Sequence, residues 1–333
     1  MDHAGHDDAH ALASSLGPAL RQACDGRLGE INWFRAAWQH GGAATGFALF
    51  TLPDGRTIET LVKLPVGAIE FRWTCGLGTL DADDAARAEL LATPRVLASG
   101  PEVGGHDLAW LVVEKLHGHP LSQGMNADDV LGLLQAACDF HETAGRVRPQ
   151  IDPPKVMDWE SSIERSRAKA RDGAISEGQK WNEAIKHVQR VLPRLLAKWN
   201  HRACGWWCHG DLHPGNAMRR VRPGGDDSPA GGRVVLIDLA LVHSGHWVED
   251  AVYLERQYWG RPELLHGVKP VSTLARLRRE RGLPVEDHYM DIANIRRVLM
   301  ASLVPLFMER EGNTKYMHAA LETINNLLPM VSK

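Results

Sequence analysis

The sequence predicts an α+β protein with two lobes, a small N-terminal sheet lobe and a larger, mostly helical C-terminal lobe. Two patterns and the chain length support this fold class. Short strand-like runs separated by glycine and proline turns occupy much of residues 1–117, whereas amphipathic helical spacing dominates residues 118–333. A chain of 333 residues with 44% apolar residues is also long enough to bury two cores. We therefore place the lobe boundary after residue 117.

The N-terminal lobe is predicted to contain an antiparallel sheet with one main helix. Its strand-like runs are short, apolar and bounded by turns such as HGGAAT and PDGR. These runs are residues 31–39, 46–52, 57–64, 94–100 and 108–116. Residues 80–92 read LDADDAARAELLA, in which Asp81 can cap the start of a helix. A helical extension, residues 1–28, precedes the sheet.

The C-terminal lobe is predicted to begin with a helix, because residues 128–145 carry apolar side chains at the spacing of one helix face. Two further helices are expected in residues 157–199, and two or three in residues 286–331. Between them, the stretch WWCHGDLHPGN at residues 206–216 leads through a polar loop to the apolar run VVLI at residues 234–237. This order of loop, strand, turn and strand predicts a hairpin.

Composition limits the classes of partner. The chain has 38 basic and 41 acidic residues, so no basic surface for nucleic acid or an anionic membrane is expected. It lacks a run of about 18 apolar residues, and its N-terminus lacks the basic and apolar segments of a signal peptide. Five cysteines in so long a chain do not indicate a disulfide framework. We expect a cytoplasmic protein that binds neither nucleic acid nor membrane; the sequence indicates no oligomeric state.

Two groups of residues have the chemistry of metal ligands. In the N-terminal segment, His6 and His10 share a helix face, with a solvated chain end as the alternative. A zinc site could also recruit Cys204, Cys208, His209 and His213. These four lie in one short run, whereas structural zinc sites usually bring together two separated pairs. A haem attachment motif needs two residues between its cysteines, and here there are three.

A third chemistry fits the same stretch. Asp211 is followed five residues later by Asn216, the spacing at which a kinase catalytic loop places a hydroxyl-orienting carboxylate beside a magnesium-binding amide. The run HGDLHPGN at residues 209–216 is similar to the catalytic loop of the aminoglycoside phosphotransferase and choline kinase superfamily, relatives of the protein kinases. The resemblance implies a protein-kinase-like fold for the two lobes, with Asp211 as the catalytic residue.

A second carboxylate follows the catalytic loop. The apolar run at residues 234–237 ends in Asp238, 27 residues after Asp211, which puts a carboxylate at the mouth of a strand. Magnesium prefers hard oxygen ligands of this kind, and the resemblance implies that Asn216 and Asp238 hold Mg²⁺. The chain has Asp-Leu-Ala where protein kinases have Asp-Phe-Gly, so a contact made by the third residue is not carried over.

The resemblance extends into the N-terminal lobe. Lys63, near the end of the third strand, is similar to the strand lysine that pairs with the phosphates of the nucleotide. Glu89 on the following helix is the expected ion-pair partner, with Glu70 or Asp84 as alternatives. A lone lysine in a strand is otherwise a solvated edge residue.

Two further segments resemble nucleotide contacts of this superfamily. The turn before the lysine strand includes Gly41 and Gly42, where small residues let backbone N–H groups approach phosphates. Glu114 and Leu116 belong to a segment that resembles the linker between lobes, whose backbone hydrogen-bonds an adenine. An ordinary hairpin turn and an exposed strand end are the alternatives. Together these matches imply ATP, or GTP, as the phosphate donor.

The resemblance spans roughly residues 30 to 260 and implies transfer of the terminal phosphate to a hydroxyl of a small molecule. In relatives, cationic acceptors meet carboxylates and aromatic rings, through charge and cation–π attraction. The substrate candidates are Glu249, Asp250, Tyr253 and Asp291, each with a structural or solvated role as the alternative. An amino sugar or aminoglycoside is the first expectation, and a neutral sugar or amino alcohol the second. The alternative function is a non-catalytic, kinase-like regulatory protein that binds nucleotide.

Overall fold

The computed structural model divides the chain into two compact units. It describes residues 4–34, 43–79, 91–154, 156–172, 175–220, 232–307 and 314–332, with side chains from residue 11 onward. Unit 1 comprises Met1–Pro120 and Asn216–Val242, and unit 2 comprises Leu121–Gly215 and His243–Lys333. From the sequence, all of residues 118–333 are expected in one lobe. In the structure, residues 216–242 belong to unit 1 instead.

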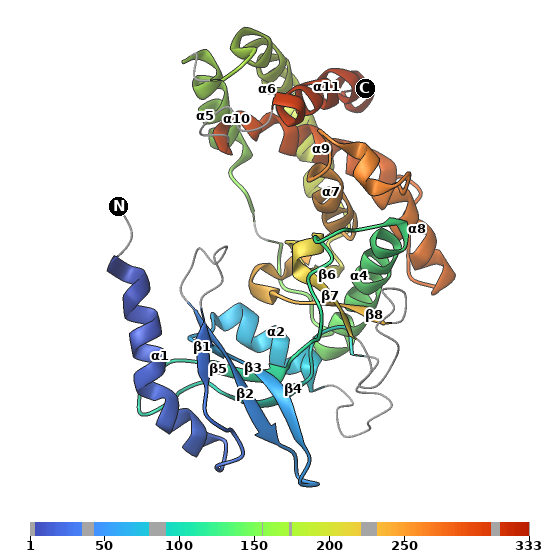
Figure 1. The fold of residues 1–333 in the computed structure, drawn as a ribbon. Coiled ribbons are helices and arrows are strands. Elements are labelled where there is room, and N and C mark those ends of the chain that lie inside the picture. The colour runs from blue at the N-terminus through green and yellow to red at the C-terminus, as the bar shows by residue number, and fades with distance from the viewer. Residues whose placement is uncertain are drawn as a thin grey trace. The chain divides into compact units, whose positions relative to one another are not determined.

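Unit 1 is built on a five-stranded antiparallel sheet (Figure 1). The strands are β1 (Asn32–Phe34), β2 (Ala44–Thr51), β3 (Thr57–Leu64), β4 (Val96–Gly100) and β5 (Trp110–Glu114). Their order across the sheet is β1-β2-β3-β5-β4, and each neighbouring pair is antiparallel. The predicted N-terminal antiparallel sheet is confirmed, including the meander formed by its first three strands.

The two faces of this sheet carry separate cores, because successive side chains of a strand point to opposite sides. On one face, α1 (Ala4–Ala23) contributes Leu20 to a buried cluster that includes Phe50 and Val62. On the other face, Phe71 of α2 (Ala68–Gly78) packs against a smaller cluster. Burial of one Leu or Phe side chain stabilises a fold by roughly 1.5–3 kcal/mol, so both helices are held by apolar contact.

The sequence does not predict α2. Its Gly76 and Gly78 are typical of a bend, and the main helix is expected instead at residues 80–92, which lie outside the described residues. Gly78 is buried where α2 meets the chain that enters β4, and a Cβ atom there would lie 2.6 Å from the carbonyl oxygen of Pro94. This glycine therefore permits a close approach between two backbones.

A two-stranded hairpin completes unit 1. β7 (Ala217–Arg220) pairs antiparallel with β8 (Arg233–Leu236), which confirms the predicted hairpin. The Leu236 N–H donates to the carbonyl of Ala92, and Arg220 donates to the carbonyls of Leu91 and Thr93. These bonds to the N-terminal part of the chain explain why the hairpin belongs to unit 1.

Unit 2 is mostly helical, as expected. Its helices are α4 (Ala127–Val147), α5 (Trp159–Arg171), α6 (Gly178–Asn200), α7 (Val248–Arg256), α8 (Pro270–Glu280), α9 (Tyr289–Ser302), α10 (Val304–Phe307) and α11 (Thr314–Val331). A short sheet pairs β6 (Trp206–Cys208) with β9 (His243–Gly245). The predicted apolar face of α4 is confirmed, because Leu133, Leu134 and Phe140 are fully buried. No described helix has the length and apolar run needed to cross a lipid bilayer.

Candidate active site

Lys63 is held at the surface of the sheet in unit 1 by an acidic partner. Leu61 and Lys63 point to the α2 face of β3, since Val62 and Leu64 belong to the core on the α1 face. The amino group of Lys63 lies 2.5 Å from a carboxylate oxygen of Glu70 on α2. The lysine side chain keeps 24% of its surface exposed. Glu70, one of the alternatives open from sequence, is thus a partner of Lys63; Glu89 lies outside the described residues.

The residues expected to contact the nucleotide base differ in what they offer. The carboxylate of Glu114 accepts hydrogen bonds from Arg220 and from the backbone N–H of Arg95, and its own N–H donates to the Arg95 carbonyl. Glu114 therefore connects Arg95 and Arg220 within unit 1. Leu116 is half-buried, and its backbone bonds to no described residue, so it stays available for the expected contact. Gly41 and Gly42 lie outside the described residues.

Asn216 and Asp238 lie beside each other at one end of the hairpin. The backbone carbonyl of Asn216 accepts the N–H of Ile237 at 3.0 Å, directly beyond the paired strands. Asp238 follows with φ 61° and ψ 73°, the left-handed region that a side chain with a Cβ adopts at a cost of about 1–3 kcal/mol. Its carboxylate is exposed and pairs with no described residue. An amide oxygen and an unpaired carboxylate at one hairpin end fit the hard oxygen ligands of Mg²⁺.

In unit 2, the catalytic-type loop is fixed by a buried carboxylate. Asp250 on α7 is fully buried and accepts the backbone N–H groups of His209 at 2.8 Å and Gly210 at 2.9 Å. Gly210 has φ +83°, a conformation that favours glycine. Burial alone would raise the pKa of Asp250, but the hydrogen bond from His141 and the loop N–H groups lower it below its usual range. The loop is therefore anchored to a charged group.

His141 and Arg278 support Asp250 from two other helices. Nε2 of His141 lies 2.9 Å from Asp250, and Nη1 of Arg278 lies 3.2 Å from Nδ1 of His141. Because a guanidinium only donates, Nδ1 accepts and the proton of the neutral imidazole sits on Nε2, facing Asp250. Arg278 lies fully buried over the ring of Trp206 at 3.9 Å, and burial lowers its pKa to about 10. The loop thus rests on α4, α7 and α8 together.

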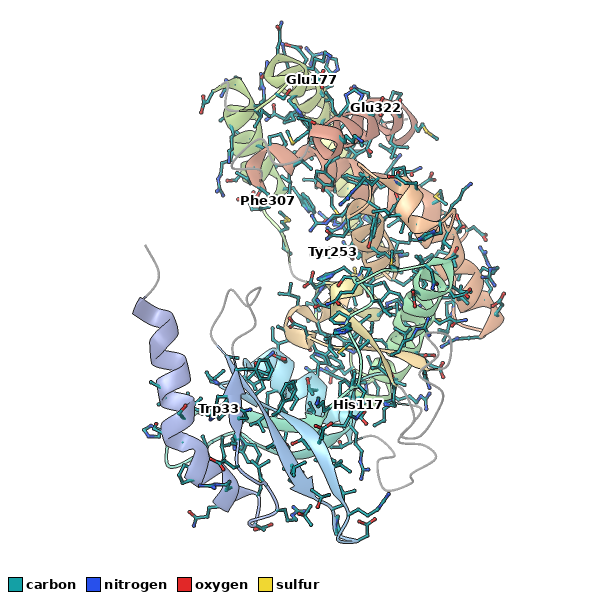
Figure 2. All side chains as sticks on the ribbon, in the orientation of Figure 1. Trp33, His117, Glu177, Tyr253, Phe307 and Glu322 are labelled. Atoms are coloured by element: carbon teal, nitrogen blue, oxygen red, sulfur yellow. The ribbon has the colours of Figure 1, made fainter. Side chains whose placement is uncertain are left out.

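Asp211 meets polar side chains while remaining partly exposed. Its carboxylate lies 3.6 Å from Nε2 of His213, and 22% of its side-chain surface is exposed. The phenol of Tyr253, marked in Figure 2, hydrogen-bonds to Asp211. Burial, and next this bond to a carboxylate, raise the pKa of Tyr253, so the phenol stays protonated and donates. The Asp211 carboxylate is therefore oriented by Tyr253 and His213 and remains partly exposed.

Comparison with known proteins identifies the family of this chain. A model of the phosphotransferase enzyme family matches residues 79–281, more than half of the chain. The chain belongs to the phosphotransferase enzyme family. The resemblance to aminoglycoside phosphotransferases is confirmed, and with it the expected enzyme class, a phosphotransferase with a hydroxyl acceptor.

Solved structures similar to this phosphotransferase share its fold. An aminoglycoside phosphotransferase from Alicyclobacillus acidocaldarius is 15% identical with a TM-score of 0.51, covering 93% of this chain and 94% of that one. The AMP-bound complex of a spectinomycin phosphotransferase is 13% identical with a TM-score of 0.54, covering 93% and 97%. A microcompartment-associated aminopropanol kinase is 15% identical with a TM-score of 0.53, covering 90% and 91%. The search of curated proteins gave no match.

Two of the carboxylates expected at the substrate site of this phosphotransferase lie in its interior. Glu249 accepts from Nε of Arg202 at 3.0 Å and from the backbone N–H of His246 at 2.9 Å. Burial would raise the pKa of Glu249, but hydrogen bonding to His243 and the nearby Arg296 and Arg202 hold it well below its usual range. Glu249 and Asp250 are buried and hydrogen-bonded to protein groups inside unit 2, so a substrate would have to displace these partners. The first turn of a helix favours acidic residues whether exposed or buried, so the sequence could not separate the two cases.

The other two substrate candidates are at least partly accessible. Tyr253 is half-buried and contacts Asp211, and Asp291 is exposed in the first turn of α9. Sequence reasoning missed His141 and Arg278, which lie 137 residues apart in the chain. Neither residue stands in a motif, so no local signal could have indicated that they meet.

Proposed function

We propose that this phosphotransferase is a kinase that transfers the terminal phosphate of ATP, or of GTP, to a hydroxyl of a small molecule. The observation that carries the proposal is Asp211, a partly exposed carboxylate in a loop anchored by buried Asp250. The similar structures include an aminopropanol kinase and an AMP-bound spectinomycin phosphotransferase, which supports a nucleotide donor and a small acceptor. A regulatory protein would not need a catalytic carboxylate fixed in this way.

Residues of unit 1 bind the donor in this proposal. Lys63, steadied by Glu70, places a positive charge against the phosphates of the nucleotide. Asn216 and Asp238 supply the oxygen ligands for Mg²⁺, which when bound neutralises charge on the phosphates. The carboxylate of Asp238 is exposed and has no partner among the described residues, which supports this role, because a carboxylate saturated by protein donors would have to release them first.

Asp211 of unit 2 acts on the acceptor. It accepts a hydrogen bond from the acceptor hydroxyl, which orients the oxygen toward the terminal phosphorus atom. The new bond joins this oxygen to phosphorus, the bond to the leaving nucleoside diphosphate breaks, and the hydroxyl proton passes to Asp211 and then to water. The Tyr253 phenol donates to the same carboxylate and fixes its orientation.

The structure weakens the argument for a cationic acceptor that the sequence alone suggested. The expectation of an amino sugar or aminoglycoside depended on carboxylates that could meet a cation, and two of these are buried and engaged with protein groups. The proposed acceptor is therefore a small hydroxylated molecule, without a requirement for an amino group.

An assay of nucleotide consumption against hydroxylated metabolites and aminoglycosides tests the proposal. The wild type should consume ATP or GTP with at least one acceptor, and D211N should lose that turnover while still binding nucleotide. Thermal stabilisation by magnesium and ATP reports binding, because a ligand that binds only the folded state raises its stability. Binding without turnover for every acceptor would favour the regulatory alternative, and a D211N variant with wild-type rate would exclude the role given to Asp211.

A further inference from the structure

Arg256 lies close to the group that would orient the acceptor. It stands three residues after Tyr253 in the last turn of α7, and its guanidinium carbon lies 4.3 Å from the centre of the Tyr253 ring. The phenol of that ring bonds to Asp211. Since a phenol reaches about 2.8 Å from its ring centre and an O–H···O bond spans about 2.7 Å, the guanidinium lies within about 10 Å of the Asp211 carboxylate. A small acceptor can span a distance up to this limit, so one molecule can reach both groups.

Arg256 has no carboxylate partner among the described residues. Its Nε atom is buried and makes no hydrogen bond within the described part of the chain. Neighbouring arginines differ, because Arg297 forms a two-pronged pair with Glu255 at 2.8 and 2.7 Å. A guanidinium kept beside the proposed acceptor position without an anion is suited to bind one from outside.

The surroundings of Arg256 carry an excess of positive charge. Arg202 and Arg296 both reach a single carboxylate, that of Glu249, at 3.0 and 3.7 Å. Burial chiefly lowers the pKa of Arg296; the Glu249 carboxylate opposes this shift, and the positive charges of Arg202 and Arg256 add to it. Arg202 and Arg296 therefore share one carboxylate, and Arg256 adds a third positive charge near them.

We propose that the acceptor carries an anionic group, a carboxylate or a phosphate, which Arg256 binds while the acceptor hydroxyl meets Asp211. The inference rests on the proposed function and adds the charge of the substrate. It predicts the reverse of the cationic acceptors expected from the sequence. A cationic group in the same position would face a guanidinium that contacts the Tyr253 phenol and has no described carboxylate partner, and would be repelled.

Four probes built on one polyol test this charge preference. D-Glycerate and glycerol 3-phosphate carry an anion, glycerol is neutral, and 3-aminopropane-1,2-diol is a cation. We expect kcat/KM to be at least tenfold higher for one of the anionic probes than for glycerol, and lowest for the amine. The two anionic probes show whether the site favours a carboxylate or a phosphate.

Variants of Arg256 separate charge recognition from folding. R256Q should remove the preference for the anionic probe, and R256K, which keeps the charge, should restore part of it. R276Q is the matched control, because Arg276 lies on the exposed side of α8 in a pair with Glu280. Thermal unfolding of each variant checks that the fold persists, so a loss confined to anionic probes cannot come from unfolding.

Calorimetric titration of the same probes in the presence of a non-hydrolysable nucleotide measures acceptor binding without turnover. Anionic probes that bind and react no better than glycerol, or a preference unchanged in R256Q, would overturn the inference about charge. Turnover of neutral or cationic acceptors that D211N abolishes would then leave the proposed function standing. Preferential binding of the anionic probe with no phosphate transfer to any acceptor would support the charge preference and count against the proposed reaction.

Discussion

Asp238 in unit 1 and Asp250 in unit 2 are carboxylates with opposite environments. Asp238 is exposed, stands in a left-handed backbone conformation and pairs with no described residue. Asp250 is fully buried and receives hydrogen bonds from two loop N–H groups and from His141. Asp238 has no described partner, which suits the metal-ligand role that we propose for it, whereas the oxygens of Asp250 hold the loop and His141. The sequence shows both simply as aspartates near a catalytic motif.

The largest expected effect is the loss of activity in D238N, which should leave stability almost unchanged. Asparagine keeps the size and tolerance of the left-handed region but removes the charge offered to magnesium. We expect kcat to fall on the order of 10³-fold, because a metal ion contributes several kcal/mol of charge stabilisation in such reactions. The free energy of unfolding measured in urea should stay within about 0.5 kcal/mol of wild type. Turnover within tenfold of wild type would remove Asp238 from the metal site.

D250A should show the opposite behaviour and lose stability. The substitution leaves two buried backbone N–H groups and His141 without their acceptor, at an expected cost of about 3–5 kcal/mol. Denaturant unfolding measures this loss directly. D128A is the control, because Asp128 lies exposed in the first turn of α4. A D250A protein as stable as the control would mean that the anchor contributes little.

Acid should lower the free energy of unfolding, because buried titratable groups near Asp250 must change protonation. His246 is buried, its Nδ1 accepts the Val248 N–H, and burial chiefly lowers its pKa from 6.5 to about 4. The unfolded chain therefore binds more protons below pH 6.5, and stability falls as the pH drops from 6.5 to 4, by on the order of 3 kcal/mol for this group. The lowered pKa values of Glu249 and Asp250 extend the loss to still lower pH.

Unfolding free energies measured between pH 8 and 4.5 check this prediction. H246Q should flatten the pH dependence, since glutamine does not titrate. An H246Q slope equal to that of wild type would assign the acid sensitivity to other groups.

The smallest effect is expected at the pair of Lys63 and Glu70. E70Q should weaken the hold on the lysine and raise the KM for the nucleotide about tenfold, equivalent to about 1.4 kcal/mol. E59Q is the matched control, because Glu59 lies on β3 with Lys63 and forms a more exposed pair with Lys115. Equal KM values for the two variants would show that Glu70 does not position Lys63 for binding.

Local patterns explain what could be predicted from the sequence. Alternating apolar residues indicated the strands of the meander, helical spacing indicated α4, and an apolar run ending in Asp238 indicated the hairpin. The catalytic loop was also readable, because Asp211 and Asn216 lie in one short motif. These features depend on neighbours in the chain.

Long-range contacts explain what could not be predicted. His141 bonds to Asp250 across 109 residues, and nothing near either residue marks the partner. α2 was missed because its glycines indicated a bend. Gly78 instead allows the backbone of α2 to lie close to Pro94, a contact that only the folded chain reveals. Arg256 is one of many charged residues in a helix, and its lack of an anionic partner among the described residues is a property of the surroundings.

The helix α7 carries three tasks at intervals of three residues. Asp250 secures the loop, Tyr253 touches Asp211 and Arg256 extends beyond the tyrosine. At a rise of 1.5 Å per residue, these positions lie about 4.5 Å apart along the helix axis. Substitution of Arg256 could therefore change the preferred acceptor without disturbing Asp250, so new specificities could arise while the loop stays anchored.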